Sequence, residues 1–225
     1  MNLNMNLNIV VTGANRGIGL SFCRHFSGLG HNVYGVCRKP SPELEKVATT
    51  IIEDIDIGNP DSCNSLFEKL SEVKIDLLIN NAGILLNETL GQIDFDSIEE
   101  QFQINALGAL RITEGLINNL HQNSKIAIIT SRMGSIADNG SGGRYGYRMS
   151  KAALNAAGKS LAVDLKPKGV AVGIFHPGLV STDMIGGNGD ISPDVAATRI
   201  AKLIDKLTVS NSGTFWHSNG EILPW

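Results

Sequence analysis

Residues 8–19, Asn-Ile-Val-Val-Thr-Gly-Ala-Asn-Arg-Gly-Ile-Gly, combine a strand-like run with a glycine-rich turn. The apolar stretch Ile9–Val11 suits a strand covered on both faces. Gly13, Gly17 and Gly19 would permit a tight turn and let the backbone come close to a bound anion. The helix that opens after the turn would present free N–H groups to that anion. Although the spacing is Gly-x-x-x-Gly-x-Gly, its place after a first strand predicts a site for the pyrophosphate of a dinucleotide.

The end of the second expected strand bears on which dinucleotide would bind. An NAD site places an acidic residue there to bind the ribose hydroxyls. Here the chain reads Val36-Cys37-Arg38-Lys39, without a carboxylate, and Arg16 lies in the glycine-rich turn. Two guanidinium groups could hold a ribose 2′-phosphate. The sequence therefore predicts NADP(H) as the cofactor, in preference to NAD(H).

Strand-like apolar runs alternate with helix-like segments along the whole chain. Strands are expected near Asn8–Thr12, Asn32–Arg38, Thr50–Asp54, Asp76–Asn80, Lys125–Ser131, Val170–His176 and Thr214–Trp216. Helices are expected near Gly17–Leu29, Pro60–Leu70, Ser97–Leu120, Tyr145–Leu165 and Pro193–Leu207. Such alternation is typical of right-handed β-α-β crossovers. It predicts an α/β fold of the Rossmann type, a doubly wound parallel β-sheet flanked by helices on both faces.

A single NAD(P)-binding domain is expected over residues 1–225, because no linker or second compositional regime interrupts the chain. Residues 1–7 lack the basic leader and apolar core of a signal peptide and are expected to form a flexible tail. No apolar run is long enough to span a bilayer, and the net charge of -3 gives no reason to expect nucleic-acid or membrane-surface binding. The three cysteines form no Cys-x-x-Cys pair, so no metal site is predicted. We expect a cytoplasmic protein.

Tyr147 and Lys151 lie four residues apart in the run Tyr-Arg-Met-Ser-Lys. On a helix, both side chains would project from one face, one turn apart. A unit charge at about 4 Å in an effective dielectric of about 20 is worth roughly 4 kcal/mol, and about 1.36 kcal/mol moves a pKa by one unit. We therefore expect the ammonium to lower the pKa of the phenol toward neutrality and make it a usable proton donor. Tyr145 is a second candidate, but Met149 stands where its lysine partner would be.

Further short motifs follow the ends of the later strands. They are Asp56-Ile57, Asn80-Asn81-Ala82-Gly83, Asn105 in Ile-Asn-Ala-Leu-Gly-Ala, Ser131 in Ile-Thr-Ser-Arg-Met-Gly, and Pro177-Gly178 followed by Val180 and Thr182. With the glycine-rich turn and the tyrosine–lysine pair, these motifs make the chain resemble the short-chain dehydrogenase/reductase family almost from end to end. The run Ser-Arg-Met-Gly-Ser-Ile-Ala-Asp-Asn at 131–139 is most similar to the C-factor-like or sniffer-like carbonyl reductases of that family.

The resemblance implies a role for each of these residues. Among four catalytic residues, Tyr147 would protonate the carbonyl oxygen, and Ser131 would hydrogen-bond the same oxygen. Lys151 would hold the ribose hydroxyls, and Asn105 would fix a water that links the lysine to solvent. The expected cofactor contacts, including those of the glycine-rich turn, are Gly13, Asn15, Arg16, Gly17, Ile18, Gly19, Arg38, Asp56, Ile57, Asn81, Ala82, Gly83, Tyr147, Lys151, Pro177, Gly178, Val180 and Thr182.

Two departures from the family pattern affect the substrate side. The stretch between Ser131 and Tyr147 is longer than in many relatives, which leaves Ser135 as a second candidate for the serine role. The segment 183–194 is short and glycine-rich where many relatives carry a longer lid, so an open or mobile pocket is expected. Candidate substrate contacts are Ile84, Leu85, Met133, Ile136, Leu179 and Met184.

The implied function is NADPH-dependent reduction of aldehydes, ketones or quinones to alcohols. One alternative is an NADP(H)-binding signalling or interaction protein of the C-factor type. Another is a nucleotide-sugar epimerase or dehydratase, but those relatives carry a larger carboxyl-terminal region than the residues that follow Thr182 here. The expected helices at 97–120 and 145–165 are apolar on more than one side, which indicates either burial within one chain or a homodimer or homotetramer interface.

Overall fold

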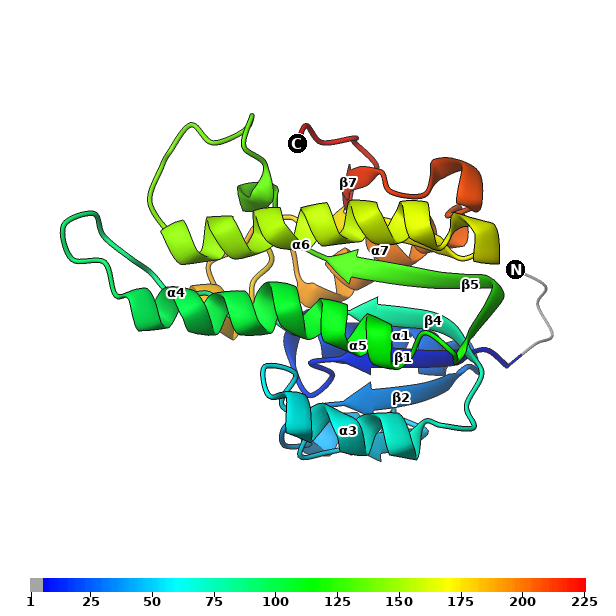
Figure 1. Ribbon diagram of the computed structural model, residues 1–225. Helices are drawn as coiled ribbons and strands as arrows, with labels where there is room; N and C mark the ends of the chain where they lie inside the picture. Colours follow the sequence, from blue (N-terminus) through cyan, green and yellow to red (C-terminus); the bar gives the residue numbers. More distant parts are fainter. Residues whose placement is uncertain (1–5) are drawn as a thin grey trace.

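Seven parallel strands form one sheet in the computed structural model, which describes residues 6–225 (Figure 1). The strands are β1 (Asn8–Thr12), β2 (Asn32–Val36), β3 (Thr50–Ile52), β4 (Ile75–Asn80), β5 (Leu120–Ile129), β6 (Ala171–His176) and β7 (Phe215–His217). Their order across the sheet is β3-β2-β1-β4-β5-β6-β7. All the named pairings are parallel, so the predicted doubly wound sheet is confirmed.

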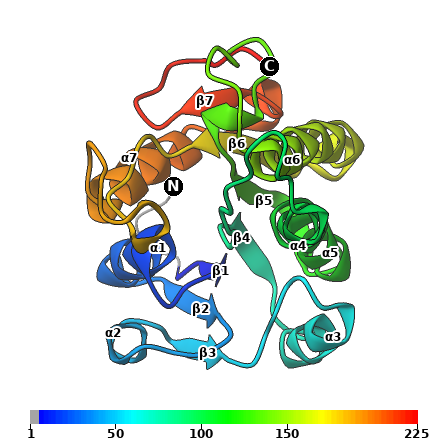
Figure 2. The same cartoon turned by 90° about the vertical axis from the view of Figure 1, so that its left-hand side faces the viewer.

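Helices cover both faces of the sheet and bury two separate cores (Figure 2). On one face lie α1 (Gly17–Gly28), α2 (Pro42–Glu45) and α7 (Pro193–Asp205); on the other lie α3 (Pro60–Lys69), α4 (Phe95–Phe102), α5 (Ala109–Gly115) and α6 (Tyr145–Asp164). Successive strand residues point to opposite faces. Val10 and Leu78 therefore join the core under α3, α5 and α6, whereas Val11 and Leu77 join the core under α1 and α7. This two-sided burial explains why the strands are apolar at nearly every position.

The strand order reverses between β1 and β4. From β1 the chain winds outward through β2 to β3, then returns to β4 and winds the other way to β7. In open α/β sheets, ligands bind in the crevice outside the carboxyl ends of the strands at such a reversal. The loops after β1 and β4 meet at this point, because Asn81 Nδ2 donates hydrogen bonds to the carbonyl oxygens of Thr12 and Gly13 at 3.0 and 3.3 Å.

The expected uninterrupted helix over 97–120 is wrong. Instead α4 leads into a π-helical segment, η1 (Gln103–Gly108), and then into α5, which ends at Gly115. The chain turns there because Asn119 Nδ2 donates to the carbonyl oxygens of Leu70 and Val73, and β5 already begins at Leu120. Residues 116–120 looked helical because their apolar side chains belong to the same core as α5.

Smaller differences concern short or terminal segments. Helix α2 was not expected, because four residues are too few to show a helical period; Ser41 caps it through its hydroxyl, which accepts from Leu44 N at 3.2 Å. Of the tail expected at 1–7, residues 1–5 lie outside the described part of the chain, whereas the Leu7 carbonyl accepts from Asn32 N at 2.9 Å. Within residues 6–225, no helix is both long and apolar enough to cross a membrane.

Candidate active site

A cavity of about 740 Å³ lies at the carboxyl ends of the strands, where the sheet order reverses. Most of the predicted cofactor residues line it, although they come from segments far apart in the sequence. They are Gly13, Asn15, Arg16, Gly17, Ile18, Arg38, Asp56, Ile57, Asn81, Ala82, Gly83, Tyr147, Lys151, Pro177 and Thr182. The volume falls within the range of about 300–1,000 Å³ that is usual for cofactor sites.

The glycine-rich turn forms one wall of the cavity. Gly13 has a φ of +66°, and a Cβ built there would lie 2.9 Å from the Ala82 Cα, so only glycine fits between the two loops. Helix α1 begins at Gly17, with no side-chain cap and no acidic residue in its first turn. Its first N–H groups therefore remain available to an anion, as a pyrophosphate requires. This part of the cavity fits a dinucleotide.

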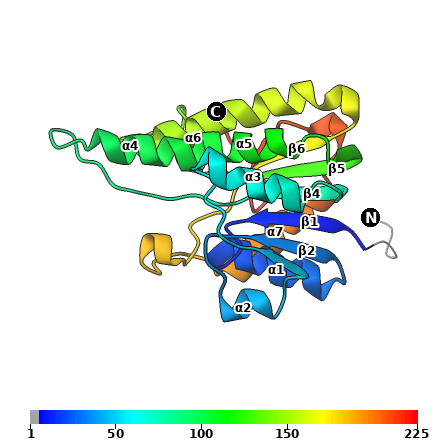
Figure 3. The same ribbon diagram turned by 60° about the horizontal axis from the view of Figure 1, so that its bottom comes forward.

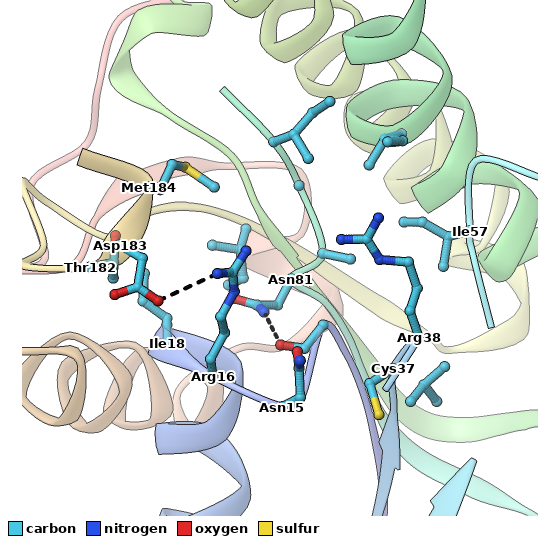
Figure 4. A pocket seen from close by; sticks show the side chains of 18 of the residues that line it. Asn15, Arg16, Ile18, Cys37, Arg38, Ile57, Asn81, Thr182, Asp183 and Met184 are labelled. Carbon is cyan, nitrogen blue, oxygen red and sulfur yellow. Dashed lines mark hydrogen bonds and ion pairs between the residues drawn. The ribbon is translucent and has the colours of Figure 1, made fainter. Parts of the chain in front are cut away.

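Two arginines reach into the cavity from neighbouring strand ends (Figure 4). Arg38 follows β2, and no carboxylate lines the cavity directly after that strand. Arg16 Nη1 lies 3.4 Å from Asp183 Oδ2, but both side chains are mostly exposed, so this ion pair is weak. The Arg16 guanidinium can therefore exchange Asp183 for a phosphate at little cost.

The loop after β4 is held at its start by a buried hydroxyl. Thr12 Oγ1, at the end of β1, accepts hydrogen bonds from the backbone N–H groups of Asn81 and Ala82 at 3.0 and 3.1 Å. Next in the chain, Gly83 leaves room for two polar groups, because an added Cβ would lie 2.9 Å from Asn105 Oδ1 and 3.4 Å from Lys151 Nζ. The Asn-Asn-Ala-Gly segment is thus hydrogen-bonded to the end of β1 on one side and lies close to Asn105 and Lys151 on the other.

Tyr147 and Lys151 lie on the first two turns of α6 and face the cavity together. Both are almost fully buried, with exposed fractions of 8% and 4%. Lys151 Nζ lies 5.8 Å from the centre of the Tyr147 ring and donates to the carbonyl oxygen of Ile129, the last residue of β5, at 3.2 Å. The predicted one-turn pairing on one helix face is therefore present.

The expected low pKa of Tyr147 is wrong in this structure. Burial raises the pKa of the Tyr147 phenol above 10.0, although a hydrogen bond with the Ser131 side chain and the nearby Arg144 guanidinium act in the opposite direction. Burial also lowers the pKa of Lys151 from 10.5 to about 8. Both shifts have the same cause, since removal from water penalises the charged form of each group. Lys151, whose charge we expected to dominate, is not among the groups that shift the pKa of Tyr147.

The structure distinguishes the two candidate serines. Ser131 follows β5 and is 7% exposed; its hydroxyl accepts from Met133 N at 3.1 Å, and its side chain lies close enough to Tyr147 to lower the pKa of the phenol. Ser135 is 2% exposed, and its hydroxyl accepts a hydrogen bond from Asp138 N at 3.1 Å within its own loop. Of the two, Ser131 is the one that acts on the Tyr147 phenol, and neither serine lines the main cavity.

Asn105 lies in the π-helical segment η1 and is fully buried. Its side chain binds both backbone groups of Ile84: Oδ1 accepts from Ile84 N at 2.8 Å, and Nδ2 donates to the Ile84 carbonyl at 2.9 Å. Nδ2 also donates to Ser150 Oγ at 3.0 Å. The extra residue of a π turn re-aims a side chain within a helix, and such turns are frequent at functional sites. Asn105 thus joins the loop after β4 to α6 without lining the cavity.

Three predicted cofactor residues do not line the cavity. A Cβ at Gly19 would overlap the carbonyl oxygen of Gly13, so this glycine allows the helix to approach the turn. Gly178 takes a φ of +96° in the turn after β6, and Val180 is 5% exposed and bridges to Ile191. Lining residues that the sequence reasoning did not select are Val36, Cys37, Lys39, Ile55, Ile104, Ile129, Thr130, Ser181, Asp183 and Pro193. Several of these residues, such as Cys37 and Thr130, directly follow a strand, and that position in the sequence could have identified them as lining residues.

The segments after β4 and β6 both extend beyond the carboxyl ends of the strands (Figure 3). Ile84 and Met184, from these two segments, line the cavity and were expected to contact substrate. Leu179 and Ile136 are 53% and 82% exposed, whereas Leu85 and Met133 are only partly buried. Of the six candidate substrate contacts, only Ile84 and Met184 therefore line the cavity, and the short segment after β6 forms just one 3-10 turn at Asp183–Ile185.

Comparison with known proteins gives consistent matches over nearly the whole chain. The model of the short chain dehydrogenase family matches residues 7–190. The chain is 39% identical over 223 residues to the 1-hydroxy-2-glutathionyl-2-methyl-3-butene dehydrogenase of Rhodococcus sp. strain AD45, covering 96% of this chain and 99% of that one. It is also 43% identical over 154 residues to the C-signal protein of Myxococcus xanthus, covering 67% of this chain and 93% of that one.

Solved structures with the same fold include two carbonyl reductases. The NADPH-bound carbonyl reductase from chicken fatty liver is 27% identical, with a TM-score of 0.86, and the match covers 98% of this chain and 100% of the reductase. The carbonyl reductase Sniffer of D. melanogaster is 28% identical, with a TM-score of 0.88, and the match covers 99% of this chain and 100% of Sniffer. The likeness to C-factor-like and sniffer-like proteins that the motifs indicated is therefore confirmed.

Proposed function

Since this protein belongs to the short-chain dehydrogenase family, we propose that it is an NADP(H)-dependent oxidoreductase that reduces the carbonyl group of an aldehyde, ketone or quinone to an alcohol. The observation that carries the proposal is the placement of Tyr147 and Lys151. Both are buried, one helical turn apart, and line the same cavity as the glycine-rich turn and the uncapped start of α1. That combination supports proton transfer beside a bound dinucleotide.

NADP(H) is the cofactor that the site favours. Arg16 and Arg38 would bind the ribose 2′-phosphate, and the glycine-rich turn with the first N–H groups of α1 would bind the pyrophosphate. Asp56 and Ile57 would contact the adenine, whereas Asn81 to Gly83 and the segment from Pro177 to Thr182 would line the nicotinamide half. The NADPH-bound chicken carbonyl reductase supports this choice. When bound, the reduced nicotinamide would supply the hydride that reaches the carbonyl carbon.

The protein's own groups would handle the proton and the developing charge. Tyr147 would donate its phenolic proton to the carbonyl oxygen, and its raised pKa keeps that proton in place through the neutral range. Ser131 would hydrogen-bond the same oxygen as negative charge develops there. Lys151 would bind the ribose hydroxyls, and Asn105, whose Oδ1 like Lys151 Nζ lies close to Gly83, would fix a water that links the lysine to solvent. Ser131 is favoured over Ser135 for this role, because only Ser131 is among the groups that act on the Tyr147 phenol.

Replacement of Tyr147 by phenylalanine tests the proposal. Because the variant keeps the ring and loses only the proton donor, we expect carbonyl reduction to fall by roughly 100- to 10,000-fold while the protein still binds NADPH. NADPH consumption with a panel of aldehydes, ketones, diones and quinones measures turnover, and quenching of protein fluorescence measures binding. Tyr145→Phe, one position before Gly146, is the matched control and should retain activity. Turnover by Tyr147→Phe at the native rate would contradict the proposal.

A second candidate function follows from the likeness to the C-signal protein, which is 43% identical over 154 residues. Under that alternative the chain binds NADP(H) and works mainly as a signalling or interaction protein. The two differ in their dependence on turnover: a biological effect that survives Tyr147→Phe, with no reduction of any panel compound by the native protein, would favour the binding role. A cytoplasmic location and assembly into a homodimer or homotetramer stay predictions from the sequence.

A further inference from the structure

The loop between β4 and α4 contains a buried carboxylate, that of Glu88, which is 6% exposed. Gln101 Nε2, from α4, donates to its Oε1 at 2.5 Å, and Ser97 Oγ, from the same helix, donates to that oxygen at 3.2 Å. The second oxygen, Oε2, accepts from the backbone N–H of Gly146 at 3.2 Å. Among residues 6–225, no lysine, arginine or histidine forms an ion pair with Glu88. The carboxylate is thus held by hydrogen bonds alone.

Gly146 lies in the first turn of α6, one residue before Tyr147, so Glu88 supplies a missing cap. The residue at the N-cap position, Arg144, has a left-handed backbone with φ of 51° and ψ of 48°, and its side chain makes no cap hydrogen bond. The first N–H groups of a helix need acceptors, and a negative charge is favourable there. Glu88, 58 positions earlier in the chain, provides both.

A second polar contact holds the same turn of α6 from its other end. Asn105 Nδ2 donates to Ser150 Oγ, which in turn donates to the carbonyl oxygen of Tyr147 at 2.9 Å. Gln101 and Asn105 lie four residues apart, and both bind the loop after β4, since Gln101 Oε1 accepts from Leu86 N at 3.0 Å. Hydrogen bonds therefore hold the backbone on both sides of the Tyr147 side chain. Glu88 binds the Gly146 N–H, and Asn105 is linked through Ser150 to the Tyr147 carbonyl.

We propose that Glu88 is a positioning residue that sets the place of the Tyr147 hydroxyl in the active site, acting through the Gly146 N–H. This inference rests on the proposed role of Tyr147 as the proton donor. It assigns to the loop after β4 a task beyond contact with substrate: its buried carboxylate fixes the start of the helix that carries the tyrosine and lysine. A displacement of about 1 Å at a catalytic group can cost on the order of 100-fold in rate.

Glu88→Gln is the most direct test, because it keeps the size of the side chain and replaces one acceptor oxygen by a donor nitrogen. That nitrogen must then face either the Gly146 N–H or the Gln101 amide, which are both donors. We expect kcat for carbonyl reduction to fall roughly 10- to 100-fold, with the KM for NADPH almost unchanged because the glycine-rich turn is not touched. Glu99→Gln, on the exposed side of α4, is the matched control and should retain native kcat.

A swap variant, Glu88→Gln combined with Gln101→Glu, tests the hydrogen bonds themselves. In it the new Gln at 88 can accept from Gly146 N and donate to the new Glu at 101, which can still accept from Leu86 N. We expect the swap to recover most of the lost kcat. Hydrogen–deuterium exchange of the 144–150 segment gives a readout that does not depend on turnover: exchange should be faster in Glu88→Gln than in the native protein and return toward native in the swap.

The outcomes separate this inference from the proposed function. If Tyr147→Phe abolishes reduction but Glu88→Gln has native kcat and native exchange, the positioning role of Glu88 is overturned and the proton donor stands. If Glu88→Gln loses activity and the swap recovers neither kcat nor exchange protection, the hydrogen-bond account is overturned. If Tyr147→Phe retains full turnover, the proposed function is overturned. Even then, exchange that is fast in Glu88→Gln and slow again in the swap variant would support Glu88 as the cap of α6.

Discussion

Tyr147 and Lys151 illustrate how burial changes the chemistry of a residue pair. The attraction between an ammonium and a phenolate falls off with distance and dielectric, and Lys151 Nζ lies 5.8 Å from the Tyr147 ring centre. Desolvation acts on each group separately, and both groups are almost fully buried. It therefore raises the pKa of the phenol and lowers that of the lysine to about 8. A tyrosine that keeps its proton suits the role of general acid in carbonyl reduction.

The depressed pKa of Lys151 predicts a pH-dependent stability. The unfolded chain holds the lysine proton up to about pH 10.5 and the folded protein only up to about pH 8. Between these values the unfolded state binds more protons, so this site makes the protein more stable as pH rises. We expect Lys151→Met to gain a few kcal/mol over the native protein below pH 8, with the gap closing toward pH 10.5. Urea unfolding at several pH values measures it.

The exposed substitution Lys166→Met is the control for simple loss of a positive charge. A gap between native protein and Lys151→Met that is constant from pH 6 to pH 10 would contradict the depressed pKa of Lys151. Carbon-13 labelled lysine offers an independent check, since the Lys151 Cε signal should titrate near pH 8.

At the scale of the elements, the close approach of α4 to α6 decides the geometry of the site. Gly146 is the contact point, because a Cβ there would lie 2.5 Å from Gln101 Nε2, 2.8 Å from Glu88 Oε1 and 3.0 Å from the Ile98 Cα. The last of these is backbone and cannot move aside. The π turn at η1 then aims Asn105 at the same helix one turn later. These contacts bind two helices, rather than isolated side chains, to the loop after β4.

Gly146→Ala separates helix propensity from packing. In an isolated helix, alanine would stabilise by about 1 kcal/mol relative to glycine. Here we expect a net loss of roughly 1–3 kcal/mol, because α6 must move away from α4, together with a fall in kcat. Thermal unfolding and NADPH turnover measure the two effects. Gly140→Ala, in the loop before α6 where nothing lies within 4 Å of the added Cβ, is the control and should leave both unchanged. A Gly146→Ala protein more stable than native would refute the packing argument.

On the scale of the whole molecule, the cavity is assembled from residues between Gly13 and Pro193. Almost every strand end and the connections on both sides of the sheet contribute, so a ligand that fills the cavity is bound only by the complete fold. Binding to the native state alone stabilises it by mass action, about 2.7 kcal/mol at a ligand concentration 100 times Kd. Cofactor affinity should therefore be readable as a shift in the Tm of the entire protein.

Arg38→Ala tests the cofactor preference at this scale. Charge-assisted hydrogen bonds contribute about 1.5–3 kcal/mol, so loss of one arginine from a 2′-phosphate site should weaken NADPH binding roughly 10- to 100-fold. We expect the Tm shift caused by NADPH to exceed that caused by NADH in the native protein, and the difference to shrink in Arg38→Ala. Arg24→Ala, on α1 away from the cavity, is the control. Equal Tm shifts with the two cofactors in the native protein would argue against NADP(H).

Much of the fold and part of the site could be predicted from residues that are neighbours in the sequence. The glycine-rich turn, the apolar strands and the spacing of Tyr147 and Lys151 are local patterns, and each imposes a backbone shape or a helix face without help from distant parts. They were sufficient for the fold and the approximate strand positions, whereas many of the cavity-lining residues were expected only from the resemblance to the short-chain dehydrogenase family. The cap from Glu88, the π turn at Asn105 and the direction of the Tyr147 pKa shift depend instead on packing between segments far apart in the chain. Hydrogen-bond partners and desolvation are properties of the assembled interior, and no spacing of residues along a chain specifies them.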